Sequence, residues 1–312
     1  MITTHSKIFI AGHKGMLGSS IFKTLKKKGY KRLITIDRNK LDLRNQSSVK
    51  KFFKVRKLDA VIVAAAKVGG IKSNMSYPAS FINDNLQIQT NIISSSYENK
   101  VKKLILFGSS CIYPKNLKKP IKENQILTGE LEKTNESYAV AKIAGIKMIE
   151  AFNKQYKTKY MCLMPCNLFG PNDNYDLHNS HFLPALIRKI FTASKKKNKK
   201  FVKLWGTGAP LREVLHVNEV AKACEFFLRK KTNQSLINIG SSTEMSIKKY
   251  ANIVKEIIDP SVSIKFDNDK KIDGVKRKKL DISLANQYGW KTKMNFLEAL
   301  NETIEDFKNF HK

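Results

Sequence analysis

The stretch KIFIAGHKGMLG, residues 7–18, carries the clearest structural signal in this 312-residue chain. It opens with a short apolar run and continues into a turn with glycine at positions 12, 15 and 18. Small residues at this spacing suit a tight turn, close approach of the backbone to a pyrophosphate, and packing of a helix on a strand. A helix that begins here would direct its free N–H groups and its positive end at phosphates. The pattern therefore predicts a strand–turn–helix unit that binds a dinucleotide.

The N-terminal half of the chain alternates strand and helix. Apolar, β-branched runs predict strands at residues 7–11, 33–37, 60–65, 104–108 and 161–165. Helical patterns lie between them, the first ending at Lys28 and the others covering 46–57, 78–99 and 137–156. Strands separated by helices are typical of βαβ units with a parallel sheet. We therefore predict an α/β fold, a Rossmann-type doubly wound parallel sheet.

Beyond Pro165 the alternation breaks into loops rich in proline, asparagine and glycine. This predicts a smaller C-terminal α/β lobe that binds a substrate. The predicted nucleotide-binding domain covers residues 1–165 with a returning segment near 213–240. The predicted substrate lobe covers 166–212 together with 241–312.

The end of the second predicted strand bears on which dinucleotide binds. Asp37 stands where an acidic residue usually bonds the 2′-hydroxyl of the adenosine ribose, which favours NAD. The guanidinium of Arg38 could instead pair with a 2′-phosphate, as could Lys14 in the glycine turn. The residues alone leave NAD and NADP open. A glycine triplet by itself also fits a simple βα turn, so the strand before it, the helix after it and Asp37 carry the prediction.

Tyr138 and Lys142 form a Y-x-x-x-K pattern in the predicted helix 137–156. The i,i+4 spacing puts both side chains on one helix face. A lysine ammonium lowers the pKa of a neighbouring phenol, so Tyr138 could exchange a proton with a carbonyl oxygen near neutral pH. Ser109 or Ser110, after the fourth predicted strand, could donate a hydrogen bond to the same oxygen. Tyrosine and lysine are common residues, so the combination with the glycine turn predicts the catalytic site.

Charge is the most unusual bulk property of the chain. Lys and Arg total 58 against 26 Asp and Glu, a formal net charge of +32. Only eight of the basic residues are arginine, whereas 50 are lysines spread along the whole chain. Arginine is the preferred residue for bidentate phosphate and base contacts. The composition therefore favours a solvated lysine surface, and no nucleic-acid partner is expected.

Neither a membrane segment nor a disulfide framework is expected. The longest uncharged apolar run, residues 61–66, has the length of a strand, whereas a membrane span needs roughly 18 residues or more. The four cysteines match neither a redox pair nor a zinc knuckle, and a chain this long needs no disulfide staple. Residues 1–7 hold no apolar signal-peptide core. We expect a cytoplasmic protein with reduced cysteines, no bound metal and no membrane partner.

Longer motifs carry a family resemblance over nearly the whole chain. They are GHKGMLGS (12–19), AAAKVGGIKSN (64–74), GSSCIYPK (108–115), YAVAKIAGIKM (138–148), MPCNLFGPNDNY (164–175), NSHFLPALIRK (179–189), WGTGAPLREVLHV (205–217) and INIGS (237–241). In these motifs the chain resembles the extended short-chain dehydrogenase/reductases. AAAKVGG, SSCIYPK and NSHFLPAL are similar to the GDP-L-fucose synthase branch of that family and separate it from related dehydratases and 4-epimerases.

The resemblance implies a 3,5-epimerase and 4-reductase that acts on GDP-4-keto-6-deoxymannose with NADP(H). The alternative is another nucleotide-sugar epimerase or reductase of the same family, and a more distant one is a non-catalytic NADP-binding or basic nucleic-acid-binding protein. Epimerisation at C3 and C5 beside a C4 ketone needs a base and an acid, and the family's pair falls at Cys111 and His181. Without the resemblance, Cys111 could be a small buried hydrophobe and His181 a member of a polar network. Ser109 and Tyr138 would hold the 4-keto oxygen. Tyr138 would donate the proton, while Lys142 would tune it and bind the nicotinamide ribose.

The resemblance also implies binding residues. Cofactor contacts fall at Gly12, His13, Lys14, Gly15, Met16, Leu17, Gly18, Arg38, Phe107, Gly108, Ser109, Ser110, Lys142, Pro165, Cys166, Asn167, Leu168 and His181. Substrate contacts fall at Lys189, Trp205, Arg212, Asp273 and Lys278. A homodimer through the predicted helices 78–99 and 137–156 is a further implication.

Four positions depart from the family pattern. Asp37 would set a carboxylate against a 2′-phosphate, which is unfavourable. Ile272 and Lys276 stand where prolines would be expected in the 271–278 stretch. Cys166 occupies a position where a small hydroxyl residue is more usual, and we expect little effect because a thiol fills a similar volume.

Overall fold

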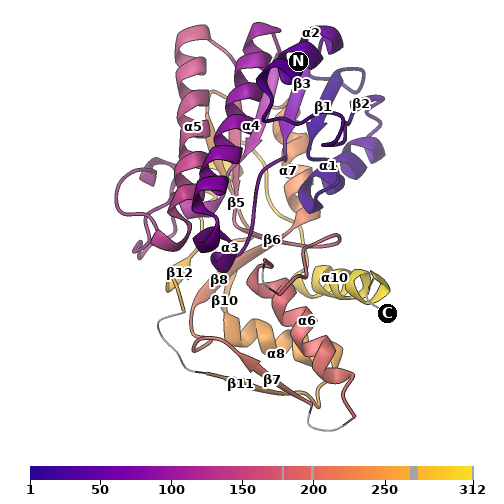
Figure 1. Ribbon diagram of the computed structural model, residues 1–312, viewed down its shortest axis with the longest axis vertical. Coiled ribbons are helices and arrows are strands. Elements are labelled where there is room, and N and C mark those ends of the chain that lie inside the picture. Colours follow the sequence, from indigo (N-terminus) through magenta and orange to yellow (C-terminus); the bar gives the residue numbers. More distant parts are fainter. Residues whose placement is uncertain (178, 198–199, 268–272, 311–312) are drawn as a thin grey trace.

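The computed structural model describes residues 1–177, 179–197, 200–267 and 273–310, which form two lobes (Figure 1). The larger lobe is built on a six-stranded sheet in the order β2-β1-β3-β4-β5-β9. Its strands are β1 (Lys7–Ala11), β2 (Arg32–Ile34), β3 (Ala60–Val63), β4 (Lys103–Phe107), β5 (Met161–Pro165) and β9 (Leu236–Ile239). Every neighbouring pair is parallel. The predicted Rossmann-type doubly wound sheet is confirmed.

Helices cover both faces of this sheet. On one face α1 (Met16–Lys27) packs against α7 (Val217–Arg229), and on the other α4 (Pro78–Glu98) packs against α2 (Gln46–Arg56) and α5 (Glu136–Tyr156) (Figure 1). The strands β3, β4, β5 and β9 are consequently buried at every position. A sheet buried on both faces is the reason why its strands read as continuous apolar runs in the sequence.

The strand order reverses between β1 and β3, which pair in register from Ile8 opposite Ala60. The chain leaves β1 toward β2 on one side and later returns to β3 on the other. Open α/β sheets bind ligands outside the carboxyl ends of their strands at such a switch point. The glycine turn after β1 lies at this point.

The smaller lobe has its own apolar core and short strands. The strands β10 (Glu244–Ser246), β8 (Leu211–His216) and β12 (Arg277–Lys278) form one sheet, to which β6 (Asn167–Phe169) adds beside β8, and β7 (Phe201–Leu204) pairs with β11 (Ser263–Phe266). The helices α6 (Phe182–Ser194), α8 (Ile247–Ile258) and α10 (Phe296–Phe310) contribute to this core. A short helix, α9 (Ser283–Gln287), packs on β9 of the large sheet instead.

The chain returns to the large sheet through α7 and β9. Because β8 belongs to the small sheet, the return covers 217–240 within the predicted segment 213–240. The division into a nucleotide-binding domain and a substrate lobe stays a proposal, with this shift of its returning boundary.

The structure differs from the predicted elements in two respects. The second predicted strand reaches Asp37, whereas β2 ends at Ile34. The helix α3 (Ile71–Ser76) and the single-turn helices η1 (Ser110–Ile112), η2 (Glu123–Gln125) and η3 (Lys133–Asn135) were not predicted. Segments this short do not fill the window of about 11–18 residues over which a helical pattern can be recognised.

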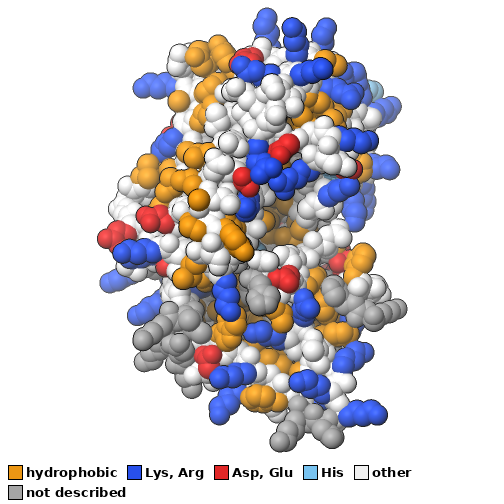
Figure 2. All heavy atoms as spheres, viewed as in Figure 1, with side chains coloured by type: hydrophobic (Ala, Val, Ile, Leu, Met, Phe, Trp, Pro, Cys, Tyr) orange, Lys and Arg blue, Asp and Glu red, His pale blue; other side chains and the backbone are white. Residues whose placement is uncertain are grey.

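Basic side chains are spread over the face seen in Figure 2, among polar and apolar ones, without gathering in one patch. The four cysteines are buried free thiols. Within the described ranges, none of the helices has the length and apolar content that a membrane crossing requires.

Candidate active site

A cavity of about 690 Å³ opens at the carboxyl ends of β1, β3, β4 and β5. Figure 2 shows a hollow on this face between the two lobes. All the residues predicted to contact the cofactor line the cavity: Gly12 to Gly18, Arg38, Phe107 to Ser110, Lys142, Pro165 to Leu168 and His181. The fold thus gathers into one space residues from six separate parts of the chain.

The glycine turn lies against the neighbouring strand end without room for side chains. Gly12 has a φ of 84°, and a Cβ there would lie 2.6 Å from the backbone nitrogen of Ala65. A Cβ at Gly18 would overlap the carbonyl oxygen of Gly12. Gly15 differs, because its Cβ would meet nothing closer than 3.6 Å. As the N-cap of α1 it makes no side-chain hydrogen bond, so the first N–H groups of α1 stay free to bind an anion.

We expect Gly18→Ala to destabilise the protein by about 3 kcal/mol, because a methyl group driven into backbone cannot be relieved by a side-chain rotation. Gly15→Ala is the matched control, and its free energy of unfolding should change by less than about 1 kcal/mol. Urea denaturation followed by circular dichroism measures both. Equal stability of the two variants would contradict the close approach of α1 to β1.

The side chain of Asp37 is held by two basic residues of the glycine turn. Its carboxylate lies 2.9 Å from Nζ of Lys14 and 3.3 Å from Nε2 of His13. The hydrogen bond from Lys14 is the main cause of a lowered pKa of Asp37. The carboxylate is therefore compensated, which weakens the unfavourable effect that Asp37 was expected to have on a 2′-phosphate. Arg38 lines the same end of the cavity.

Ser109, Tyr138 and Lys142 come together where β4 ends and α5 begins. The Ser109 hydroxyl hydrogen-bonds with the Tyr138 side chain, and Nζ of Lys142 donates to the carbonyl oxygen of Phe107 at 2.9 Å. The Tyr138 ring packs edge-on against Phe81, with the ring centroids 6.1 Å apart. The catalytic set predicted from the sequence is thus assembled at one wall of the cavity.

The predicted lowering of the Tyr138 pKa is wrong for this arrangement. Burial raises the pKa of Tyr138 well above its ordinary value, and the nearby Cys111 thiol adds to the rise. Lys142 is 4% exposed, and burial lowers the pKa of its own ammonium. Its Nζ lies 5.7 Å from the centroid of the Tyr138 ring and donates a hydrogen bond to the carbonyl oxygen of Phe107. Tyr138 therefore holds its proton throughout the neutral range.

Cys111 and His181 approach the site from different lobes. Cys111 lies in η1, is 5% exposed and hydrogen-bonds with Ser109. Burial raises the pKa of the Cys111 thiol, while the nearby Lys278 ammonium opposes the rise. His181 is the N-cap of α6 and lines the cavity, where solvent reaches the imidazole but surrounding protein still lowers the pKa of His181. At neutral pH the thiol keeps its proton and the imidazole is uncharged.

The five residues predicted to hold the substrate lie in the smaller lobe and do not line this cavity. Nζ of Lys189 lies 4.6 Å from the centroid of the Trp205 ring. Arg212 on β8 lies opposite Lys278 on β12 in the small sheet. The Lys278 ammonium is also near enough to Cys111 to act on the pKa of its thiol.

Asp273 has a structural partner. Its carboxylate accepts hydrogen bonds from the backbone N–H and the hydroxyl of Thr207 at 2.8 and 2.7 Å. Both carboxylate oxygens are thereby used to hold the turn before β8. Residues 271 and 272, at the start of the stretch that departs from the family, lie outside the described residues.

Comparison with known proteins places this arrangement in a family. The model of the NAD dependent epimerase/dehydratase family matches residues 8–240, which include the glycine turn, Ser109, Tyr138 and Lys142. The chain belongs to this family.

Several members of the NAD dependent epimerase/dehydratase family are similar over nearly the full length. GDP-L-fucose synthase 1 of Arabidopsis thaliana is 47% identical over 96% of this chain and 92% of its own. GDP-L-fucose synthase of Escherichia coli strain K12 is 41% identical over 96% of each. The solved GDP-mannoheptose C4 reductase of Campylobacter jejuni with NADP bound is 35% identical, with a TM-score of 0.90 over 99% of this chain and 100% of that one.

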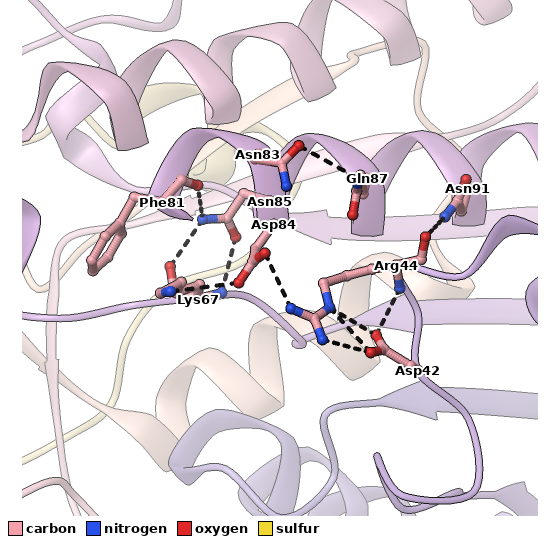
Figure 3. A network of polar contacts seen from close by, with 9 residues as sticks. All are labelled: Asp42, Arg44, Lys67, Phe81, Asn83, Asp84, Asn85, Gln87 and Asn91. Carbon is pink, nitrogen blue, oxygen red and sulfur yellow. Dashed lines mark hydrogen bonds and ion pairs between the residues drawn. The ribbon is translucent and has the colours of Figure 1, made fainter. Parts of the chain in front are cut away.

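A polar network on the cavity wall was not found from the sequence (Figure 3). The Arg44 guanidinium pairs with both carboxylate oxygens of Asp42 and reaches Asp84 at 3.2 Å. Its hydrogen bonds lower the pKa of Asp42 to about 2. Asn85 on α4 binds both the N–H and the C=O of Lys67, each at 3.0 Å. The AAAKVGG motif was the sequence feature that could have pointed to this network, because the hydrogen bonds of Asn85 hold Lys67 of that motif against α4.

A second missed residue is Asp173, in the motif MPCNLFGPNDNY. Asp173 lines the cavity beside Asn172, Asn174 and Asn179. One of its carboxylate oxygens accepts the Asn174 N–H at 2.7 Å, whereas the other is buried without a partner in the described part of the chain. Burial raises the pKa of Asp173 to about 7.

Asp173 should make stability depend on pH. Because its folded pKa lies above its unfolded pKa of 3.8, its favourable contribution is fully present below pH 3.8 and is lost as pH rises toward 7. The loss is up to about 4 kcal/mol at one pKa unit per 1.36 kcal/mol. Asp173→Asn should remove this loss, so its advantage in melting temperature over the wild type should grow from pH 4 to pH 8. A difference in melting temperature that stays constant from pH 4 to pH 8 would refute this effect of Asp173.

The cavity fits a dinucleotide on the observations above. Gly12 and Gly18 keep side chains out of the turn, and α1 offers uncapped N–H groups to a diphosphate. Lys14 and Arg38 supply positive charge at the end of the cavity near Asp37. Tyr138 and Lys142 line the same cavity near the end of β4, which β3 separates from the glycine turn after β1.

Proposed function

We propose that the protein converts GDP-4-keto-6-deoxymannose to GDP-L-fucose by epimerisation at C3 and C5 and reduction at C4, with NADP(H). The observation that carries the proposal is the meeting of Ser109, Tyr138, Lys142 and His181 at one cavity, with Cys111 hydrogen-bonded to Ser109. The similarity to GDP-L-fucose synthases of 41–47% identity over nearly the full chain supports it.

NADP rather than NAD is supported from two sides. A solved relative carries NADP. In this chain Asp37 is paired with Lys14 and His13, so Arg38 meets a compensated carboxylate rather than a free one. The cofactor would be held by the glycine turn, Arg38, Lys142 and the 165–168 segment, and it supplies the hydride for C4 when bound.

The protein's own residues handle the oxygen and its proton during reduction. The hydroxyl groups of Ser109 and Tyr138 lie within hydrogen-bond reach of each other, and each can turn its one hydrogen to the 4-keto oxygen when the substrate is bound. Tyr138 is protonated at neutral pH, so it has a proton to give as the alkoxide forms. Lys142 is fixed by its hydrogen bond to the carbonyl oxygen of Phe107, with its Nζ 5.7 Å from the centroid of the Tyr138 ring.

Epimerisation uses the same polarised ketone. Hydrogen bonds from Ser109 and Tyr138 stabilise the enolate that forms when a proton leaves C3 or C5. The uncharged imidazole of His181 has a lone pair that can accept a proton, and the thiol of Cys111 has one to give. The pair therefore holds the two capacities that inversion at carbon requires.

The direct test is incubation of the purified protein with GDP-4-keto-6-deoxymannose and NADPH. Loss of NADPH absorbance and a GDP-L-fucose product identified by NMR are expected. No consumption of NADPH would contradict the proposal.

A C4 reductase without epimerase activity is the second candidate, because a solved relative of that name matches the whole chain. It would need Ser109, Tyr138 and Lys142 but not Cys111 and His181 together. Reaction in D₂O separates the two, since only an epimerase incorporates deuterium at C3 and C5.

We also propose a homodimer through α4 and α5. Tyr97 of α4 stacks on Tyr156 of α5, with ring centroids 4.1 Å apart, and both rings are about two-fifths exposed. Figure 2 shows apolar side chains on the surface at the side where α5 lies. Apolar patches of this kind mark protein interfaces. Sedimentation velocity should give twice the chain mass of 35.6 kDa, and a single-chain mass at micromolar concentration would refute the dimer.

A cytoplasmic location is the compartment we propose. The four cysteines are free thiols, and a reducing compartment preserves such thiols. Fractionation of the source cells with an antibody to the protein tests it, and recovery outside the cytosol would contradict it.

A further inference from the structure

Trp205 is an exposed aromatic residue with two lysines over its ring. It follows β7 in the smaller lobe and is 52% exposed. Nζ of Lys189, on α6 of the same lobe, lies 4.6 Å from the ring centroid. Nζ of Lys72, on α3, lies 4.2 Å from the same centroid. Lys72 is part of the segment between β3 and α4 of the large lobe, so the indole ring joins the two lobes.

The position of Lys72 is fixed from both sides. On one side Asn85 of α4 holds Lys67 in the segment that leads to α3 (Figure 3). On the other side the N–H of Gly70 donates to the carbonyl oxygen of Asn179 at 2.9 Å. A Cβ on Gly70 would lie 2.9 Å from the carbonyl oxygen of Ser180, so the start of α3 lies directly on the smaller lobe. The contact with Trp205 is therefore part of a tight junction between the lobes.

The charges at this junction are balanced by the protein only in part, by the Asp267 carboxylate, which attracts Lys189 without forming an ion pair with it. Among the described residues, neither Lys72 nor Lys189 forms an ion pair with a carboxylate. Burial lowers the pKa of Lys189, and repulsion from Lys72 lowers it further. Each ammonium is attracted to the ring face, but the two repel one another. An anion that contacts both would remove the repulsion.

We propose that Lys72 binds the phosphate groups of the nucleotide-sugar substrate together with Lys189 and Trp205. This inference rests on the proposed function, because it names a further substrate-positioning residue for that site. A nucleoside diphosphate suits the cluster, since its phosphates carry the charge that two ammonium groups require and its base or sugar has an apolar face for the indole ring. Lys72 then links the lobe that carries the catalytic residues directly to the substrate held by the other lobe.

The test compares Lys72→Gln with Lys54→Gln, which removes the same charge from an exposed position on α2. Calorimetric titration with GDP should show an affinity about tenfold weaker in Lys72→Gln and unchanged in Lys54→Gln. Lys72→Arg should keep most of the affinity. In turnover, Lys72→Gln should raise KM for the keto sugar about tenfold and leave kcat and NADPH affinity within twofold.

Guanosine serves as the probe without phosphates, and its affinity should be the same in wild type and Lys72→Gln. Equal GDP affinity in wild type and Lys72→Gln, equal losses in both Gln variants, or an equal loss for guanosine would each overturn the assignment. So would a wild-type protein that does not bind GDP. If wild type binds GDP and only Lys72→Gln weakens it, the assignment stands even where the keto sugar is not turned over, and the proposed function alone fails.

Discussion

Tyr138→Phe is expected to lower kcat for reduction of the 4-keto sugar by about 10²–10⁴-fold, the range that a positioned general acid contributes. The ring keeps its packing against Phe81, so the variant should fold and bind NADPH like the wild type. What it loses is the proton donor, which burial keeps protonated. Stopped-flow measurement of NADPH oxidation at saturating substrate determines the effect.

Deuterium exchange at C3 and C5 gives the internal control for Tyr138→Phe. Ser109 still donates to the ketone oxygen, so exchange should fall much less than reduction. Tyr160→Phe removes a buried phenol that bonds the carbonyl oxygen of Val101 at the far end of β5, and it should leave kcat unchanged. A Tyr138→Phe variant that reduces the ketone within tenfold of the wild-type rate would remove Tyr138 from the role of acid.

Cys111→Ser should produce the other large effect, a loss of about 10²–10⁴-fold in deuterium exchange at C3 and C5. A hydroxyl group fills similar space but is a far weaker acid than the thiol. Reduction of a ketone already epimerised should persist, because Ser109, Tyr138 and Lys142 are untouched. Cys224→Ser is the matched control and should leave exchange unchanged, since that thiol is also buried but lies on α7, outside the cavity lining.

The pH dependence of exchange follows from the same pair. Burial lowers the pKa of His181 from 6.5 and raises the pKa of Cys111 from 9.0. The state with an uncharged imidazole and a protonated thiol therefore spans a wide window around neutral pH. Exchange should fall on the acid side below pH 6.5 and on the alkaline side above pH 9, and Cys111→Ser should lack the alkaline fall. A maximum narrower than this window, or an unchanged profile in the variant, would contradict the assignment.

Sequence patterns were most informative where the physics is local. The glycine turn, the apolar strands and the Y-x-x-x-K spacing each depend on residues within one or two elements, and the structure places them as predicted. The effect of charged residues on one another could not be predicted in this way, because it depends on tertiary contacts. Asp37 was expected to disfavour a 2′-phosphate, but the turn that precedes it by more than 20 residues supplies the compensating ammonium of Lys14.

The sequence by itself determined the architecture of the large lobe, because continuous apolar strands, period-3.6 helices and a glycine-rich turn are properties of short segments. It also determined which side chains meet at the carboxyl ends of the strands, because a doubly wound sheet has one switch point. Only the tertiary structure decided how those side chains are charged, because burial, which raises the pKa of Tyr138 and of Asp173, depends on everything packed around them. Only the packing of one lobe on the other brought Lys72 to Trp205, since no pattern within a chain segment encodes a contact across 133 positions.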